Sequence, residues 1–184
     1  MKPTEILMEE HRVIERVLTA LERAAGRLSR GEEVYLRFFI GTSVFIKNFV
    51  DDYHHKKEEG VLFPALVENG LNDEAGPVAM MLAEHEEERR LSQRMRQMTE
   101  RLQAGDAHAR DLVIQSGLGY VRLVRQHIIK EDNVLFPVAD KVIPVNQQDQ
   151  IIEAFNRIKY VEDGEELHAK YYGLADRLVQ ECIR

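Results

Sequence analysis

The residues of this chain that are best suited to metal chemistry lie in an internal repeat. Residues 54–66, HHKKEEGVLFPAL, align with residues 127–139, HIIKEDNVLFPVA, and seven of the thirteen positions are identical. Each copy begins with a histidine and has a glutamate four residues later, which places both side chains on one face of a helix. The two candidate ligand pairs are His54 with Glu58 and His127 with Glu131.

A shorter repeat accompanies the first one. EEH at residues 9–11 aligns with AEH at residues 83–85, at an offset of 74 residues, and the longer copies are offset by 73. The chain therefore consists of two helix pairs, each with one histidine on its first helix and H-x-x-x-E on its second. A bundle can be built by such a duplication without any site, so the repeat by itself predicts only symmetry.

Long helices are expected to position these residues, because glycine and proline are sparse and apolar residues recur at helical spacing. No alternating pattern typical of strands is present. Pro64 should bend or end the second helix, and the fourth should end before Pro137. The pattern predicts helices over residues 4–30, 33–63, 77–104 and 108–136, and two shorter ones over 146–160 and 165–183.

Four long amphipathic helices with short connections predict an all-α fold, an antiparallel up-down-up-down four-helix bundle. We assign the bundle to residues 1–143. Residues 144–184 form an extension of two extra C-terminal helices, which could pack on the bundle or on a second subunit of a homodimer. Gly41, Gly117 and Gly119 lie within helices and favour close helix packing over a ligand channel.

The four histidines of the repeats should meet at one level of this bundle. Each lies 20–23 residues from the turn of its helix pair, at Gly31 or Gly105. That separation is roughly 30 Å at about 1.5 Å per residue. Because both turns reverse the chain, all four imidazoles reach the same end. The side chains expected in this layer are His11, His54, Glu58, His85, His127 and Glu131.

Such a layer needs a common partner, because buried glutamates are rare unless they are paired. A metal ion supplies that partner. Imidazole and carboxylate ligands from facing helices suit iron or manganese better than structural zinc, which prefers tetrahedral, cysteine-rich sites. Six ligands suit two ions, each with two histidines and one carboxylate. A lone core histidine would be ordinary packing, but the duplicated motif favours metal ligation.

The doubled H-x-x-x-E-[ED]-x-V-L-F-P motif, with Glu-His on the first and third helices, resembles the hemerythrin-like (HHE cation-binding) domain family over about residues 5–140. Ferritin-like di-iron proteins differ, since they carry Glu-x-x-His. The resemblance implies two iron ions with bridging carboxylates and an oxo or hydroxo bridge, reactive with dioxygen; Mn or Zn is less expected. The matching positions are His11, His54, Glu58, His85, His127 and Glu131.

Two positions depart from the oxygen-carrying hemerythrins. The carriers have a fifth histidine one turn after the histidine of the third helix, where this chain has Arg89. Their last ligand is an aspartate five residues after the histidine of the fourth helix; Glu131 corresponds better here, and Asp132 is a minor candidate. A missing imidazole favours peroxide or NO chemistry, or sensing, over reversible oxygen storage. Glu88 or Glu10 could instead fill the gap.

The other histidines are expected outside the metal layer. On an α-helix His55 points about 100° away from His54 and should be exposed. His108 is expected on the surface at the start of the fourth helix. For His168, in the C-terminal extension, a packing role is favoured over that of a lid or a donor near the metal. Glu88 lies one step from the inward phase of its helix and should be solvated or salt-bridged.

Composition excludes several classes of function. The chain has 25 basic and 32 acidic residues, a net charge of −7 and no dense basic run, so no nucleic-acid partner is expected. No apolar stretch approaches the roughly 20 residues needed to cross a bilayer, so no membrane partner is expected. The single cysteine, Cys182, cannot form an internal disulfide, which favours the cytoplasm.

Together these features predict a protein that binds or senses a small ligand such as dioxygen, NO or peroxide at a carboxylate-bridged metal pair. Two alternatives stay open. One is an enzyme that decomposes peroxide or reduces NO, favoured by the missing fifth histidine, and the other is a metal-storage or structural cation site. The sequence does not decide whether the protein is an enzyme. We expect a sensor to need a separate signalling or redox partner.

Overall fold

The structure, a computed structural model, describes residues 1–72, 74–160 and 164–183 and contains no strand within them. None of the helices in these ranges is long and apolar enough to cross a membrane. The α-helices are α1 (Pro3–Ser29), α2 (Arg37–Phe45), α3 (Phe63–Glu68), α4 (Pro77–Gln103), α5 (Ala109–Lys130), α6 (Phe136–Val142), α7 (Val145–Tyr160) and α8 (Gly164–Ile183). Three segments are π-helical: η1 (Ile46–His55), η2 (Glu58–Leu62) and η3 (Glu131–Leu135).

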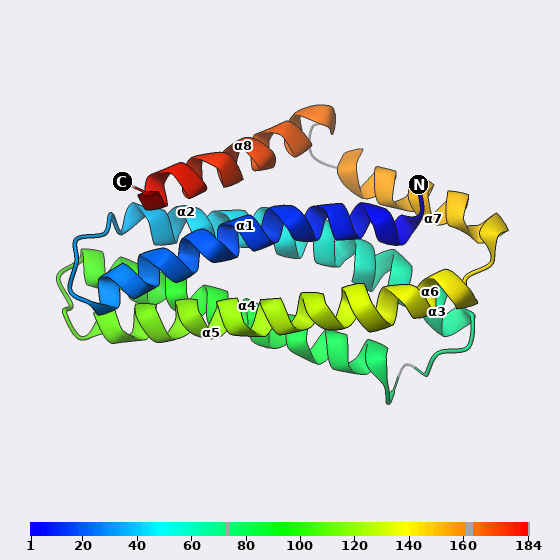
Figure 1. Cartoon of the computed structure of the whole chain (residues 1–184), viewed down its shortest axis with the longest axis horizontal. Helices are drawn as coiled ribbons and strands as arrows, with labels where there is room; N and C mark the ends of the chain where they lie inside the picture. The colour runs from blue at the N-terminus through cyan, green and yellow to red at the C-terminus, as the bar shows by residue number, and fades with distance from the viewer. Residues whose placement is uncertain (73, 161–163, 184) are drawn as a thin grey trace.

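Four long helical segments lie lengthwise beside one another (Figure 1). They are α1, the run from α2 to α3, α4, and the run from α5 to α6. The predicted stops at Gly31 and Gly105 are confirmed: their φ angles of 76° and 97° lie in the left-handed region, which glycine adopts without a steric penalty. The predicted bounds of the first, third and two C-terminal helices agree with α1, α4, α7 and α8 to within one residue.

The ranges predicted for the second and fourth helices are wrong at their C-terminal ends, because neither helix ends at its proline. The second helix begins at Arg37 and continues past Pro64 to Glu68, and the fourth continues past Pro137 to Val142. Each proline lies in the first turn of an α-helix that directly follows a π-helical segment. Proline cannot donate to the carbonyl four residues before it, but the first-turn amides of a new α-helical segment need no such bond. The π-to-α junction therefore accommodates each proline without a break.

The apolar core is divided into two clusters. The larger is built mainly from α1, α2, η1, α4, α5 and α8, and the smaller lies around α3, α6 and α7. The histidines of the predicted layer lie near the border of the two clusters: His11, for example, lies between Leu7 of the smaller cluster and Ile14 of the larger. The metal-binding candidates therefore form a polar layer with apolar packing on both sides.

The C-terminal extension packs on the bundle of its own chain. Helix α8 runs along α1 and α2 (Figure 1). Gly41 on α2 allows this close approach, because a Cβ at that position would lie 3.2 Å from Cδ2 of Leu178. The buried residues that the extension adds to the two clusters are Ile151, Phe155, Tyr171, Ala175, Leu178 and Cys182.

Candidate metal centre

All six residues predicted from the sequence lie in one buried layer, each at most 1% exposed. Their potential ligand atoms form two sets, within each of which the atoms lie no more than 4.8 Å apart. Glu58 belongs to both sets, and His55 belongs to the set that contains His85 and His127. The sets are His11, His54, Glu58 and Glu131, and His55, Glu58, His85 and His127.

The expectation that His55 is exposed is wrong, because its side chain is 1% exposed. Glu88 is 0% exposed and so is not solvated, but its oxygens lie 3.5 Å from His55 Nε2 and 3.7 Å from His127 Nδ1, as the salt-bridged alternative predicted. His55 lies in π-helical η1, where i→i+5 bonding winds more residues into each turn than an α-helix does. The angle between neighbours is therefore smaller, and His54 and His55 are both turned inward. Glu88 lies three residues after His85 and four before Ser92, on the buried face of α4. That spacing was visible in the sequence.

Each predicted histidine donates its Nδ1–H to a carboxylate on another helical segment. This contact fixes the ring tautomer and turns Nε2 into the layer. Asp132 and Glu59 occupy equivalent positions in the repeat, and so do Glu10 and Glu84. The pairs are His11 with Asp132 at 2.7 Å, His54 with Glu10 at 2.9 Å, His85 with Glu59 at 2.7 Å and His127 with Glu84 at 3.0 Å.

Basic side chains pair with all four carboxylates, three of them at the oxygen that faces away from the imidazole and Arg89 at the same Glu59 oxygen that His85 uses. Lys57 pairs with Glu10, and Lys130, its equivalent in the repeat, pairs with Glu84. Burial opposes ionisation of Glu10, but the hydrogen bond with His54 and the charge of Lys57 hold its pKa below the ordinary value. In the same way, Arg12 contacts Asp132 and Arg89 contacts Glu59.

The Nε2 atoms of facing histidines are very close. His11 Nε2 and His54 Nε2 are 3.0 Å apart, and so are His85 Nε2 and His127 Nε2. A neutral imidazole that donates from Nδ1 carries a lone pair on Nε2, and two such lone pairs repel unless a cation or proton lies between them. Two nitrogens at about 2.1 Å from one ion and at right angles would be about 3.0 Å apart. The spacing therefore fits a shared metal ion.

The two glutamates of the layer connect its halves. None of their oxygens has a hydrogen-bond partner among the described residues. Glu58 Oε1 lies 3.4 Å from His54 Nε2, and its Oε2 lies 3.6 Å from His85 Nε2. Glu131 Oε2 lies 3.2 Å from Nε2 of both His11 and His127. Each carboxylate therefore contacts one histidine of each facing pair, and its buried oxygens are available to a metal ion.

Burial and neighbouring charges shift the pKa values of this layer in both directions. Burial and the neighbouring Glu131 raise the pKa of Glu58 well above its ordinary value. Burial also opposes ionisation of Glu131, yet His127 and His11 hold its pKa well below the usual range. Burial lowers the pKa of His54 to about 4, which keeps that ring neutral. Neutral imidazoles beside carboxylates are the form in which these groups bind metal ions.

The phenylalanines of the repeated V-L-F-P sequence close one side of the layer. Phe136 stacks on the His11 ring, with centroids 5.5 Å apart and planes at 11°, and Phe63 stacks on His85 at 5.9 Å and 20°. The two contacts are equivalent in the repeat. They continue the smaller apolar cluster directly onto the imidazoles and keep solvent from that side.

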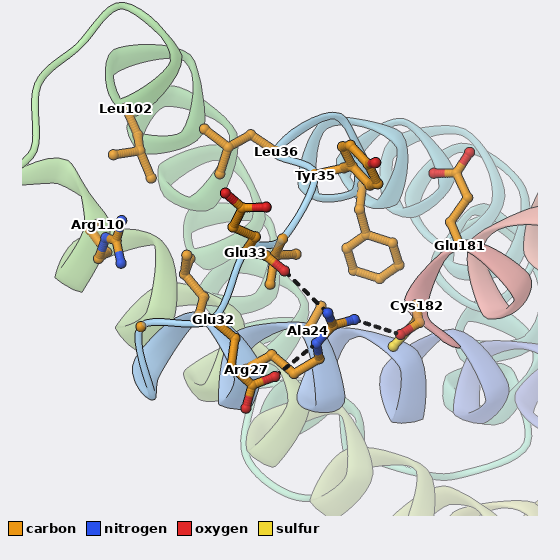
Figure 2. A pocket seen from close by; sticks show the side chains of 14 residues that line it. Ala24, Arg27, Glu32, Glu33, Tyr35, Leu36, Leu102, Arg110, Glu181 and Cys182 are labelled. Carbon is orange, nitrogen blue, oxygen red and sulfur yellow. Dashed lines mark hydrogen bonds and ion pairs between the residues drawn. The ribbon is translucent and has the colours of Figure 1, made fainter. Parts of the chain in front are cut away.

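A separate hollow of about 660 Å³ is lined by residues around the Gly31 turn, and Figure 2 shows its side chains. The side chain of Arg27 is held at the wall of this hollow by three hydrogen bonds. Arg27 hydrogen-bonds the Glu32 carboxylate and the backbone oxygens of Glu33 and Cys182. No candidate metal ligand lines this hollow, so it has no part in the centre.

Two histidines remain. His108 is exposed, as predicted. The side chain of His168 lies outside the described part of the chain, so the packing role expected for it stays a prediction.

Comparison with known proteins agrees with the resemblance. The sequence profile of the family described as "Hemerythrin HHE cation binding domain" matches residues 2–139. Uncharacterised proteins of Mycobacterium bovis and of two Mycobacterium tuberculosis strains are each similar, with 28% identity over 161 residues, or 88% of this chain. The chain spans 62% of the length of these relatives. No solved structure gives a significant match.

Proposed function

Because the chain belongs to the hemerythrin HHE cation-binding family, we propose that it is a cytoplasmic di-iron protein that binds or senses a small ligand such as dioxygen, NO or peroxide. The observation that carries this proposal is the pair of 3.0 Å contacts between Nε2 atoms, flanked by bridging carboxylates. His11 and His54 would hold one ion, His85 and His127 the other. Glu58 and Glu131 would contact both.

The donor set favours iron over zinc in this proposal. Two nitrogens of a tetrahedral zinc site, each about 2.1 Å from the ion, would be about 3.4 Å apart, whereas the facing Nε2 atoms are 3.0 Å apart. The smaller separation suits the adjacent positions of an octahedron. Two histidines and a carboxylate on adjacent positions are typical ligands of non-haem iron. Bound iron supplies Lewis-acid and one-electron redox chemistry, which small oxidants and NO require.

The surroundings of the layer favour a small ligand. The six residues are at most 1% exposed, and apolar clusters lie on both sides of them. A diatomic molecule or peroxide can reach such a layer through small fluctuations of the packing, whereas an organic substrate would need it opened. The up-down-up-down order of the long segments is part of this proposal, and the meeting of four histidines at one level supports it.

We propose binding and not turnover of the ligand, and the experiment below distinguishes the two. Arg89 stands where the oxygen carriers have an imidazole, which favoured an enzyme with an accessible ion. His55 brings a further imidazole to the same layer, so Arg89 does not by itself favour an accessible ion. A separate signalling or redox partner stays a prediction.

Metal analysis followed by spectroscopy tests the proposal. The purified chain, reconstituted with Fe(II) without oxygen, should hold about two irons. The double variant His54→Ala/His127→Ala should hold none and keep its helical circular dichroism, whereas the exposed control His108→Ala should match the wild type. A stable absorption change on adding dioxygen, NO or peroxide supports binding, and continuous peroxide or NO consumption identifies an enzyme. Zinc without iron would refute the di-iron assignment.

A further inference from the structure

At three inward positions, one half of the bundle has polar side chains where the other half has aliphatic ones. The aliphatic residues are each 2% exposed, so these positions pack well without a polar group. Burying a polar group is costly unless it has a partner. The three polar residues therefore require an explanation other than packing. The equivalent pairs are His55 with Ile128, Asp51 with Val124, and Glu88 with Ile14.

Asp51, His55 and Glu88 form a string of polar groups that ends at the metal layer. His55 Nδ1 lies 3.5 Å from Oδ1 of Asp51, and His55 Nε2 lies 3.5 Å from Oε2 of Glu88. A ring nitrogen of His55 also lies within 4.8 Å of a carboxylate oxygen of Glu58 and a ring nitrogen of His85. The inner end of the string is therefore in the layer itself.

The string has hydrogen-bonding capacity that the described residues do not use. Oδ1 of Asp51, Nδ1 of His55 and both carboxylate oxygens of Glu88 are buried and have no hydrogen-bond partner in the described part of the chain. His55 is 1% exposed and Glu88 is 0% exposed. A small molecule that both donates and accepts hydrogen bonds, such as water or hydrogen peroxide, can satisfy donors and acceptors of this kind in turn.

The outer end of the string is a surface hollow of about 400 Å³, and the carboxylate of Asp51 belongs to its wall. The Asp51 side chain is only 9% exposed, so it lies between the hollow and His55. Three acidic and three basic side chains line the hollow, which therefore favours neither anions nor cations. They are Asp51, Asp52, Glu59, Lys47, Lys56 and Arg89.

Arg89 covers the way from this hollow to the string. Its guanidinium pairs with Glu59 and Glu86, and its Nε lies 4.0 Å from Oδ1 of Asp51. The Arg89 side chain is 23% exposed. Because these contacts are made by the end of a long side chain, rotation of that side chain would open Asp51 to the hollow without moving the backbone.

We propose that small neutral polar molecules, namely water and hydrogen peroxide, enter the metal layer from this hollow along Asp51, His55 and Glu88, and that Arg89 covers the entrance. The proposal rests on the proposed function and gives its polar ligand a route of its own. Dioxygen and NO form only weak hydrogen bonds, gain nothing from the string and pass through the aliphatic packing. The other half has no such route at the equivalent positions, because isoleucine and valine fill them.

The substitution Arg89→Ala tests the route for water in the metal-free full chain. NMR measures the exchange of the ring N–H of His55 with water, with the ring N–H of His54 as an internal reference. We expect exchange at His55 to be about tenfold faster in the variant, because opening no longer breaks charge-assisted contacts. The control Arg12→Ala removes the corresponding contact with Asp132 in the other half and should leave the exchange at His55 unchanged.

The iron-loaded protein tests the route for hydrogen peroxide. One hydrogen peroxide accepts one electron from each of two Fe(II) ions together with two protons, and leaves as two waters. Stopped-flow absorption gives the rate of this oxidation and the rate of NO binding. Arg89→Ala should raise the ratio of the peroxide rate to the NO rate about tenfold, and Arg12→Ala should not change it.

The triple variant Asp51→Val/His55→Ile/Glu88→Ile copies the residues of the other half and closes the route. It should hold two irons and lower the ratio of the peroxide rate to the NO rate at least about tenfold, because the string no longer offers hydrogen bonds. If the triple variant does not fold, His55→Ile alone interrupts the string at its centre and replaces it.

Several results would overturn the proposal. They are equal exchange at His55 in the wild type and Arg89→Ala, an equal acceleration by Arg12→Ala, and a wild-type ratio of rates in the triple variant. Loss of iron from the triple variant would also overturn it, since residues of the string would then be metal ligands. Fewer than two irons in the wild type would refute the di-iron function, whereas exchange in the metal-free chain would still decide whether the route exists.

Discussion

Among single residues, the carboxylates that accept the Nδ1–H bonds of the histidines were the hardest part of the centre to predict from the sequence. Glu10 and Glu84 directly precede a histidine in both halves of the repeat. Each accepts the Nδ1–H of a histidine from a different helical segment, His54 and His127 respectively. The repeated Glu-His pair was therefore a signal for these partners. The spatial pairing could not be derived from it, because it depends on which helices lie next to each other.

Removing one of these carboxylates should weaken metal binding without unfolding the protein. Glu84→Gln keeps the side-chain volume but loses the charge that orients His127, and such partners typically contribute 10–100-fold to metal affinity. We expect a loss of about that size in competition with a chelator. The control Glu87→Gln lies on the same helix and pairs with Arg90 at the surface. Equal affinities for the two variants would contradict the orienting role of Glu84.

Among the helices, sequence periodicity predicted α1 and α4 to within a residue because both follow regular α-helical winding. The same reasoning failed for η1, since a fixed angle of about 100° per residue cannot place both His54 and His55 on the inner face. A π-helical segment has no simple sequence signature and is stabilised by the contacts it makes. The outward phase predicted for Glu88 was a different kind of error, because the spacing of buried residues on α4 already included it.

Helix α8 should stabilise the fold without contributing to metal binding. Leu178 is 2% exposed and packs against Gly41 of α2. Leu178→Ala should lower the free energy of unfolding by about 2–5 kcal/mol, the range for a buried leucine, and leave about two irons per chain. Chemical denaturation and metal analysis measure the two effects. The control Val145→Ala, at an 81% exposed position, should change neither. Loss of iron in Leu178→Ala would show that α8 supports the centre.

In the molecule as a whole, the buried layer links stability to pH when no metal is bound. Burial raises the pKa of Glu88 to about 8. The pKa of His127 is also raised, because Glu131 outweighs the opposing effect of burial. Above about pH 7.5 an unfolded glutamate is ionised and unfolded histidines are mostly neutral. The folded chain then binds more protons than the unfolded chain, so its stability decreases as pH rises.

The metal-free protein should therefore be less stable at pH 8.5 than at pH 7.5. Each retained proton contributes at most roughly 1.4 kcal/mol per pH unit, and urea unfolding at both values measures the sum. Glu88→Gln removes one of the titrating groups and should reduce the slope. A stability that is constant or increases over this interval would show that these groups are not protonated in the folded chain.

The position of the polar layer between two apolar clusters has a consequence for the uniqueness of the fold. Leucine and phenylalanine packing tolerates exchange and repacking, so apolar contacts alone would permit a helix to slide along its neighbours. A slide of one helical turn, about 5.4 Å, would separate each imidazole on that helix from its carboxylate and leave both buried among apolar side chains. Buried polar groups are known to select one alignment in this way. The layer thus sets the longitudinal alignment of the helices. A duplicated sequence needs such a constraint, because its similar halves could otherwise pack against each other in a shifted register.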